Sequence, residues 1–203
     1  VGPGSDGEVL TSTGAGSTPA FEAAGGGGAW TFIEKVTAST SATVDLEGLS
    51  STYDNYCVIV NGIKVSVHGA NLEIRFERGG SYVAGSAYDA TSFGRYDSLT
   101  ANTIQSSSVA GGDNIVVGKG INLTAGWGGG LVAYFFDTQT TSNHQRFCVG
   151  QHVSSENALN DLAVYNFGGR IDASTSALTG IRFICSSGNI DAGDFRLYGM
   201  ANS

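Results

Sequence analysis

The sequence predicts an all-β protein: an antiparallel β-sandwich, jelly-roll-like, preceded by an extended glycine-rich N-terminal segment. Apolar and polar side chains alternate with a period of two in many short runs, which is the pattern of half-buried strands. Clusters of Gly, Ser, Asn and Asp separate these runs at the intervals typical of sandwiches. Of the 203 residues, 41% are hydrophobic, so the chain can bury a core. Jelly-roll closure is the expected arrangement because it leaves few long strand edges bare.

Two regions with different composition divide the chain. Residues 1–29 are rich in turn-forming residues, contain the run Gly25–Gly28, and have no Lys or Arg. This composition predicts an extended linker or attachment segment. Residues 30–203 carry the period-two pattern and are expected to form the β-sandwich domain.

The clearest strand is predicted over Leu72–Glu77, where apolar and charged side chains alternate strictly. One face of such a strand meets the core and the other meets water. The other predicted strands are Trp30–Val36, Ala42–Leu46, Asn55–Val67, Asn114–Leu123, Gly130–Asp137, His144–Val153, Leu162–Phe167, Gly180–Cys185 and Asp194–Met200. Only Ser154–Leu162 favours one or two helical turns.

Charge and hydropathy limit the partners of the protein. The net charge is −8 and only three residues are Lys, which argues against nucleic acid, because neutralising phosphates needs clustered cations. The longest apolar runs, Tyr56–Val60 and Leu131–Phe136, are shorter than the roughly 18 residues of a transmembrane helix. Only 14% of the residues are charged, so the strand surfaces are expected to be moderately apolar and to associate as a homo-oligomer.

The three cysteines, Cys57, Cys148 and Cys185, each lie inside an apolar strand-like run. We expect buried free thiols that pack as small hydrophobic groups, with one disulfide and one leftover thiol as the alternative. Free thiols fit folding in a reducing cytosol.

Two stretches resemble structural proteins of tailed bacteriophages. Residues 7–22, GEVLTSTGAGSTPAFE, resemble a segment found in tail-fibre and related proteins. Residues 49–56, LSSTYDNY, together with IRF at 181–183, SSGNI at 186–190 and GDFRLYGM at 193–200, resemble the two ends of a C-terminal β domain of phage fibres. These matches frame most of residues 7–200, whereas the region from about Tyr82 to Asn160 carries no such resemblance.

The resemblance implies a fibre component of the virion, synthesised in the host cytoplasm and usually assembled as a homotrimer. Its last domain would bind the host surface or cap the fibre, and its N-terminal segment would join other tail or virion proteins. The motif residues have structural roles: Gly7, Gly14 and Gly16 permit turns, and Pro19 fixes an extended path. None of them is a catalytic group.

Enzymatic and metal chemistry find little support in the sequence. A glycan hydrolase needs two carboxylates across a groove. The acidic candidates occur singly in turn-like sequence: Asp89, Asp97, Asp113, Asp137, Glu156, Asp161 and Asp172. His144 and His152 have the even spacing of one strand face, and His68 stands apart, but no other ligand type accompanies them in a metal-binding pattern. No cofactor, metal site or catalytic residue is therefore predicted.

Receptor binding requires aromatic platforms and polar groups on a rigid scaffold. Tyr82, Tyr88 and Tyr96 supply such rings in the region without a resemblance, and Trp127 lies among glycines. Cross-strand packing is the alternative for the tyrosines, and insertion into a neighbouring subunit is the alternative for Trp127. The sequence thus favours a non-enzymatic phage fibre domain that binds a bacterial surface glycan or outer-membrane component as a homotrimer. A purely architectural virion protein (head fibre, decoration or tail-assembly part) and a glycan-degrading tailspike are the alternatives.

Overall fold

A computed structural model describes residues 5, 8–23, 29–97, 102–121, 128–156 and 161–201. All fifteen of its regular elements are strands, and no helix suited to spanning a membrane occurs in these ranges. The first eight strands are β1 (Glu8–Thr11), β2 (Ala20–Ala23), β3 (Trp30–Ser41), β4 (Thr43–Leu46), β5 (Asn55–Val65), β6 (Ala70–Arg78), β7 (Ser81–Tyr82) and β8 (Tyr88–Asp97). The others are β9 (Asn102–Gly112), β10 (Ile115–Ile121), β11 (Gly129–Phe136), β12 (His144–Glu156), β13 (Asp161–Ser174), β14 (Leu178–Cys185) and β15 (Ile190–Met200).

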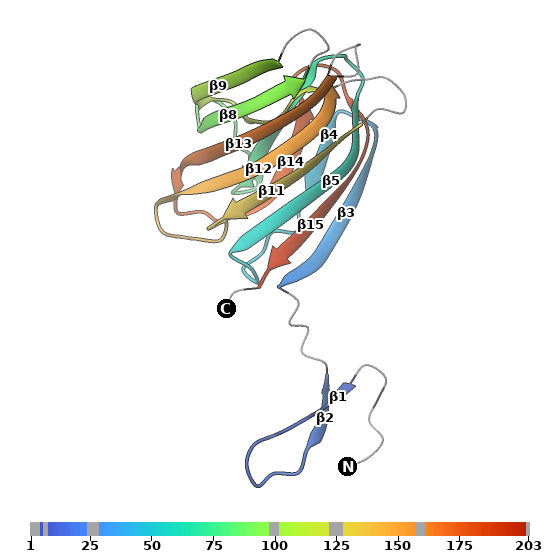
Figure 1. Cartoon of the computed structure of the whole chain (residues 1–203). Coiled ribbons are helices and arrows are strands. Elements are labelled where there is room, and N and C mark those ends of the chain that lie inside the picture. Colours follow the sequence, from blue (N-terminus) through green and yellow to red (C-terminus); the bar gives the residue numbers. More distant parts are fainter. Residues whose placement is uncertain are drawn as a thin grey trace.

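The larger layer, which we call the front sheet, has the strand order β3-β15-β5-β11-β12-β13-β8-β9. Every pairing in it is antiparallel. Figure 1 shows these strands side by side from β9 to β3. The strands β3 and β9 are its two edges.

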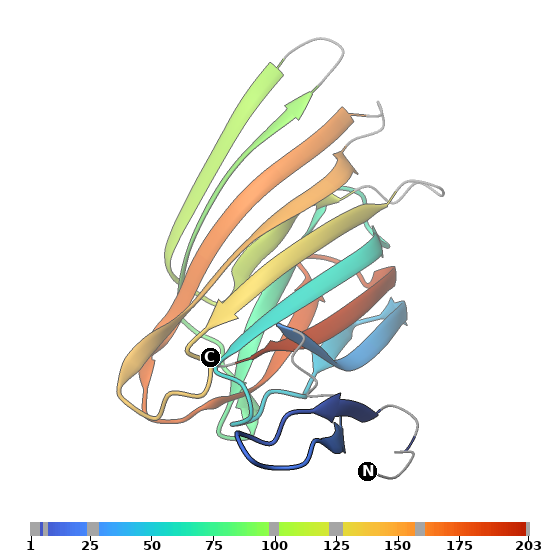
Figure 2. The same ribbon diagram turned by 60° about the horizontal axis from the view of Figure 1, so that its bottom comes forward.

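The smaller layer, the back sheet, has the order β10-β6-β14-β4, with the short strand β7 beside β6. Its strands are also antiparallel. The two sheets are hydrogen-bonded to each other where β10 meets β12 at the single pair Ile121 and Glu156. The pairing is confined to this point, so one continuous sheet can fold over into two facing layers, as Figure 2 shows.

Aromatic contacts across the two layers locate the core. Phe183 of the back sheet lies 4.9 Å from Phe195 of the front sheet, and Phe76 lies 5.7 Å from Phe135, measured between ring centroids. All four rings are almost completely buried. Side chains pointing inward from both layers therefore share one hydrophobic core, and the all-β antiparallel architecture predicted from the sequence is confirmed.

The loop before β5 is held in place by the side chain of Tyr56. The Tyr56 ring is buried, and its hydroxyl accepts a hydrogen bond from the Ser50 amide and donates one to the Ser50 carbonyl, both at 2.7 Å. Tyr53 packs edge-on against Tyr56 at 6.0 Å. The buried hydroxyl is thus satisfied by the backbone of its own loop, which fixes the path into β5.

The structure can be compared with the predicted strand Leu72–Glu77, the predicted helical turns and the predicted N-terminal segment. Leu72–Glu77 is a strand with inward Leu72, Ile74 and Phe76, as expected, but Glu73 on the face predicted to meet water is also buried. The helical turns predicted over Ser154–Leu162 are wrong for the described part of that range, since 154–156 end β12 and 161–162 begin β13. Twelve paired positions along β12 and β13 outweigh the weak local helix preference. The predicted extended segment 1–29 contains the β1–β2 hairpin, paired from Glu8 with Ala23 to Thr11 with Ala20.

Candidate functional site

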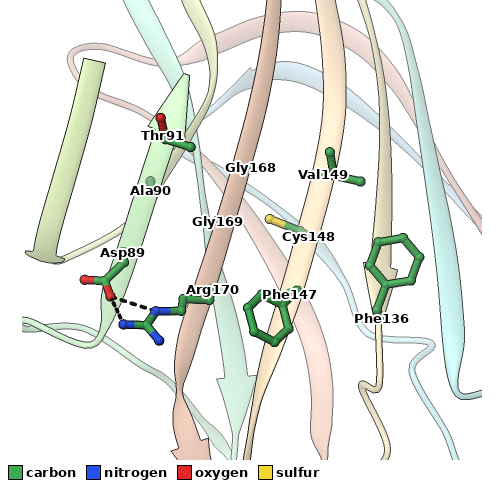
Figure 3. Close-up of a pocket in the computed structure, with 10 residues that line it drawn as sticks. All are labelled: Asp89, Ala90, Thr91, Phe136, Phe147, Cys148, Val149, Gly168, Gly169 and Arg170. Carbon is green, nitrogen blue, oxygen red and sulfur yellow. Dashed lines mark hydrogen bonds and ion pairs between the residues drawn. The ribbon is translucent and has the colours of Figure 1, made fainter. Parts of the chain in front are cut away.

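An open hollow of about 460 Å³ lies on the front sheet. Figure 3 shows the residues that surround it on β8, β13, β12 and β11. They are Asp89, Ala90, Thr91, Phe136, Phe147, Cys148, Val149, Gly168, Gly169 and Arg170. We call this site the Gly168 hollow.

The hollow exists because Gly168 provides no side chain to fill a row of outward positions. In register, Gly168 lies between Thr91 of β8 and Val149 of β12. A Cβ atom added to Gly168 would meet only the Cys148 carbonyl oxygen, at 3.8 Å, so the space above it is free. A Cβ on Gly169 would instead lie 2.6 Å from the Ile115 side chain. Gly169 therefore permits close packing of the layers, while Gly168 opens the surface.

The polar wall of the hollow is an ion pair between Asp89 and Arg170. Arg170 Nε donates to Asp89 Oδ2 at 2.7 Å, and its Nη2 atom also contacts this oxygen. The Gly111 amide donates to the other carboxylate oxygen at 2.8 Å, and Arg170 Nη1 donates to Gln145 Oε1 at 2.6 Å. This geometry fixes both charged groups, which are partly exposed.

Hydrogen bonding keeps the Asp89 carboxylate ionised. The bond from the Gly111 amide, followed by that from Arg170, lowers the pKa of Asp89 because both favour the charged form. Among the residues that line the hollow, all of which the structure describes, Asp89 is the only acid. The site thus offers a fixed hydrogen-bond acceptor, and it lacks the paired carboxylates with opposed pKa values that glycoside hydrolysis uses.

The same outward row continues from the ion pair into aromatic and apolar side chains. Phe147 is 47% exposed and lies in register with Phe136 on one side and Arg170 on the other. The aromatic surface continues toward the β3 edge, where Trp30 lies 5.9 Å from Tyr134 and 6.0 Å from Tyr198 between ring centroids. A wall of this kind can pack against the apolar C–H face of a sugar ring, with Asp89 and Arg170 positioned for its hydroxyl groups.

Two of the four site residues predicted from the sequence, Tyr82 and Tyr88, have described side chains, and neither of them lines the Gly168 hollow. Tyr88 is fully buried, and its hydroxyl accepts from the Phe76 amide and donates to the Val83 carbonyl. Its proposed contact with a receptor is therefore wrong, because the ring belongs to the core. Burial raises its pKa to about 12.

Tyr82 lies on the back sheet, away from the Gly168 hollow. The guanidinium carbon of Arg182 sits 3.8 Å from the centre of its ring, and Arg182 in turn makes a two-bond ion pair with Asp45. Desolvation raises the pKa of Tyr82 to about 12. This stacking accounts for Tyr82 as a cross-strand packing residue, the alternative that the sequence had left open.

The two remaining candidates are Tyr96, of which the structure describes the backbone, and Trp127. The backbone of Tyr96 lies near the end of β8, paired with Thr103 of β9 and Ala163 of β13. Trp127 lies outside the described residues. Of the residues that do form the hollow, Asp89 is one of the seven single acids named from the sequence, and Gly168 lies just beyond the predicted strand Leu162–Phe167. Outward aromatic residues such as Phe147 in the predicted strand His144–Val153 were the one available signal.

The histidines and cysteines do not form a metal centre. His144 is exposed at the start of β12, whereas His152 is buried between the layers, so the even spacing does not place them in a common site. No group of three potential metal-ligating side chains occurs among the described residues. All three cysteines are free, with Cys57 and Cys148 buried as expected and Cys185 only half-buried.

No family model, curated protein or solved structure matches the chain. The geometry of the Gly168 hollow is accordingly the main structural basis for a functional proposal.

Proposed function

We propose that the protein is a bacteriophage fibre component that attaches the virion to the host by binding a surface glycan in the Gly168 hollow, as a homotrimer. One observation carries this proposal: one outward row joins the fixed Asp89–Arg170 pair to the aromatic rings of Phe147 and Phe136, and this row borders a hollow that Gly168 leaves empty. Sugar-binding sites need this combination of an apolar platform and a few oriented polar groups.

The resemblance to fibre proteins supports the biological setting. Residues 7–22 coincide with the β1–β2 hairpin, in which Val9 and Leu10 are exposed. A two-stranded hairpin is marginally stable alone, so its apolar residues fit a role in joining other tail or virion proteins. The site would then belong to a virion whose subunits fold in the host cytoplasm.

The strand order supports the jelly-roll-like topology that the sequence favoured. The back sheet has the order β4-β14-β6-β10. The front sheet contains the order β5-β13-β8-β9, with the pair β11 and β12 inserted between β5 and β13 and with β15 and β3 added beyond β5. Two facing sets of four strands in this order correspond to a jelly roll with one added hairpin.

Repetition would strengthen a weak glycan contact. Single sugar contacts in an open hollow give low affinity, but three copies on one rigid assembly raise the effective concentration of the second and third contacts. A homotrimer is in keeping with the exposed apolar side chains of the front sheet.

The test fills the hollow without disturbing the core. Gly168→Val places a branched side chain where an added Cβ meets nothing closer than 3.8 Å, so the variant is expected to fold and to lose glycan binding. Gly130→Val is the matched control, because Gly130 also faces outward on this sheet and its Cβ would meet nothing closer than 3.6 Å. Binding is measured by interferometry on immobilised capsular and O-antigen polysaccharides from a panel of bacteria.

We expect the wild type and Gly130→Val to bind the same polysaccharide and Gly168→Val to bind at least tenfold more weakly. Equal binding by Gly168→Val, or no binding of the wild type to any polysaccharide, overturns the proposed site. The chain length of the bound polysaccharide is then measured by gel filtration. Unchanged length supports an adhesin, and shortened chains would show a hydrolase and contradict the proposal.

A further inference from the structure

The edge of the front sheet at β9 lacks the usual protection against pairing with another chain. Among the described strands β9 pairs only with β8, and none of its 11 residues is charged or proline. Protein edge strands are commonly short, or carry charges or proline, which discourage pairing with a further strand. By contrast, the opposite edge, β3, carries Glu34 and Lys35. The β9 edge is therefore suited to accept a partner strand.

An apolar surface lies directly beside this edge on the outer face of the sheet. It is formed by five exposed side chains, Phe93 (56%), Ile104 (68%), Val153 (43%), Leu162 (55%) and Val164 (40%). We call this surface the edge patch. Contiguous exposed apolar side chains of this kind commonly mark an interaction surface.

The edge patch is continuous across four strands and separate from the Gly168 hollow. Ile104 pairs with Arg95, which pairs with Val164, which pairs with Val153. Between this row and the hollow, Gln151 Nε2 donates to Asn166 Oδ1 at 2.8 Å. This polar pair separates the two surfaces on β12 and β13, whereas on β8 Phe93 of the edge patch lies in the same row as Asn166.

A single cation lies within the edge patch. Arg95 is exposed, and it takes part in none of the ion pairs between described side chains, which do not include those of Asp97, Glu156 and Asp161. Arginine is enriched at protein interfaces because its planar head forms directed bonds to carboxylates. The chain has 18 acidic and only 10 basic residues, so a second copy brings carboxylates in excess.

We propose that the β9 edge and the edge patch form the contact between copies of this chain, with an edge strand of a second copy hydrogen-bonded to β9. The front sheet would then continue across the interface, with main-chain bonds providing affinity and the edge patch providing specificity. A second copy fits because its β3 edge, of 12 residues, matches β9, of 11, in length, and pairing of these two unlike edges can close a ring of three subunits. This inference rests on the self-association part of the proposed function and is independent of glycan binding.

The experiment compares three proteins by light scattering at micromolar concentration. Ile104→Lys places a charge at the β9 end of the edge patch, at a position already 68% exposed, so folding should be retained. Val67→Lys is the matched control, since Val67 is also exposed (41%) but lies between β5 and β6 and belongs neither to β9 nor to the edge patch. Phe93→Asp provides a second test of the patch. Circular dichroism and the unfolding midpoint verify that each variant is folded.

We expect the wild type and Val67→Lys to be oligomeric and both patch variants to dissociate at least tenfold more readily. Hydrogen exchange of the amides in 102–112 should be slow in the oligomer and fast in Ile104→Lys. Unchanged association of both patch variants overturns this surface while leaving self-association intact. Fast exchange of these amides in the wild-type oligomer overturns the strand pairing. A monomeric wild type overturns both this inference and the proposed homotrimer, whatever the result of the polysaccharide assay.

Discussion

Lowering the pH is expected to destabilise this protein through one buried histidine. His152 is 1% exposed, and neither of its ring nitrogens has a hydrogen-bond partner in the described structure. The ring fits between the layers because Gly118 and Gly129 lack side chains: an added Cβ on either would lie 3.2 Å from it. Desolvation lowers the pKa of His152 from 6.5 to about 4, since burial disfavours the charged imidazolium.

The sign and size of the effect follow from the difference between the two states. In the unfolded chain His152 binds a proton as the pH falls through about 6.5, whereas in the folded protein it resists protonation until about pH 4. His152 therefore leaves the free energy of unfolding unchanged above pH 6.5 and lowers it as the pH falls toward 4. The two pKa values correspond to a loss of about 3 kcal/mol over this interval, a large part of the stability of a typical domain.

Urea unfolding at pH 7.0, 6.0, 5.0 and 4.5, followed by circular dichroism, measures this loss. His152→Leu should remove most of it and should be at least as stable as the wild type at pH 7, because two unpaired buried nitrogens disappear. His144→Gln, at an exposed position, is the control and should keep the wild-type dependence. If His152→Leu loses as much stability as the wild type between pH 6.5 and 4.5, the reasoning is refuted.

Two other predictions follow from buried groups. Arg146 is fully buried and donates to four backbone carbonyls, those of Thr140, His144, Ser174 and Ser176. Arg146→Met should therefore lower the free energy of unfolding by about 3–5 kcal/mol. A decrease of less than about 1 kcal/mol in a urea titration would contradict this role. Burial raises the pKa of the Cys57 and Cys185 thiols to about 11 and that of Cys148 to about 12, so a disulfide reagent at pH 8 should label no cysteine within minutes until denaturant exposes all three, and rapid labelling of the native protein would contradict it.

Alternation in the sequence identified the strands whose two faces differ in polarity. Leu72–Glu77 was predictable because its apolar residues face the other layer and its charged residues do not. The hairpin of β8 and β9 was not predictable, because both of its faces mix small, polar and apolar residues. There Gly94 leaves room for the Tyr165 ring, whose nearest carbon would lie 2.0 Å from an added Cβ. A glycine in this role marks a packed strand, although in a sequence it usually indicates a turn.

The candidate site was less predictable than the fold, because it depends on register between strands distant in the sequence. Asp89 and Arg170 lie 81 residues apart and meet only because β8 and β13 pair. The strand predicted over Leu162–Phe167 stops short of Gly168, but β13 continues to Ser174. The burial of Tyr88 and the stacking of Tyr82 on Arg182 likewise follow from pairing that local composition does not specify. Residue type alone selected aromatic rings, and the fold determined which of them remained exposed.

The arrangement of the front sheet allows attachment and assembly to be separated. The row of Gly168 and the row of Val164 lie four residues apart on β13, which is roughly 13 Å along a strand. The hydrogen-bonded pair Gln151 and Asn166 lies between them. A contact between copies at the β9 edge would therefore repeat the hollow without filling it, and each added copy would add one glycan contact. Separate residues form the two surfaces. Gly168→Val should therefore weaken glycan binding per subunit without changing assembly. Ile104→Lys should weaken assembly without changing glycan binding per subunit. Loss of binding to polysaccharide in Ile104→Lys should then reflect lost multivalency, which crosslinking the subunits would restore.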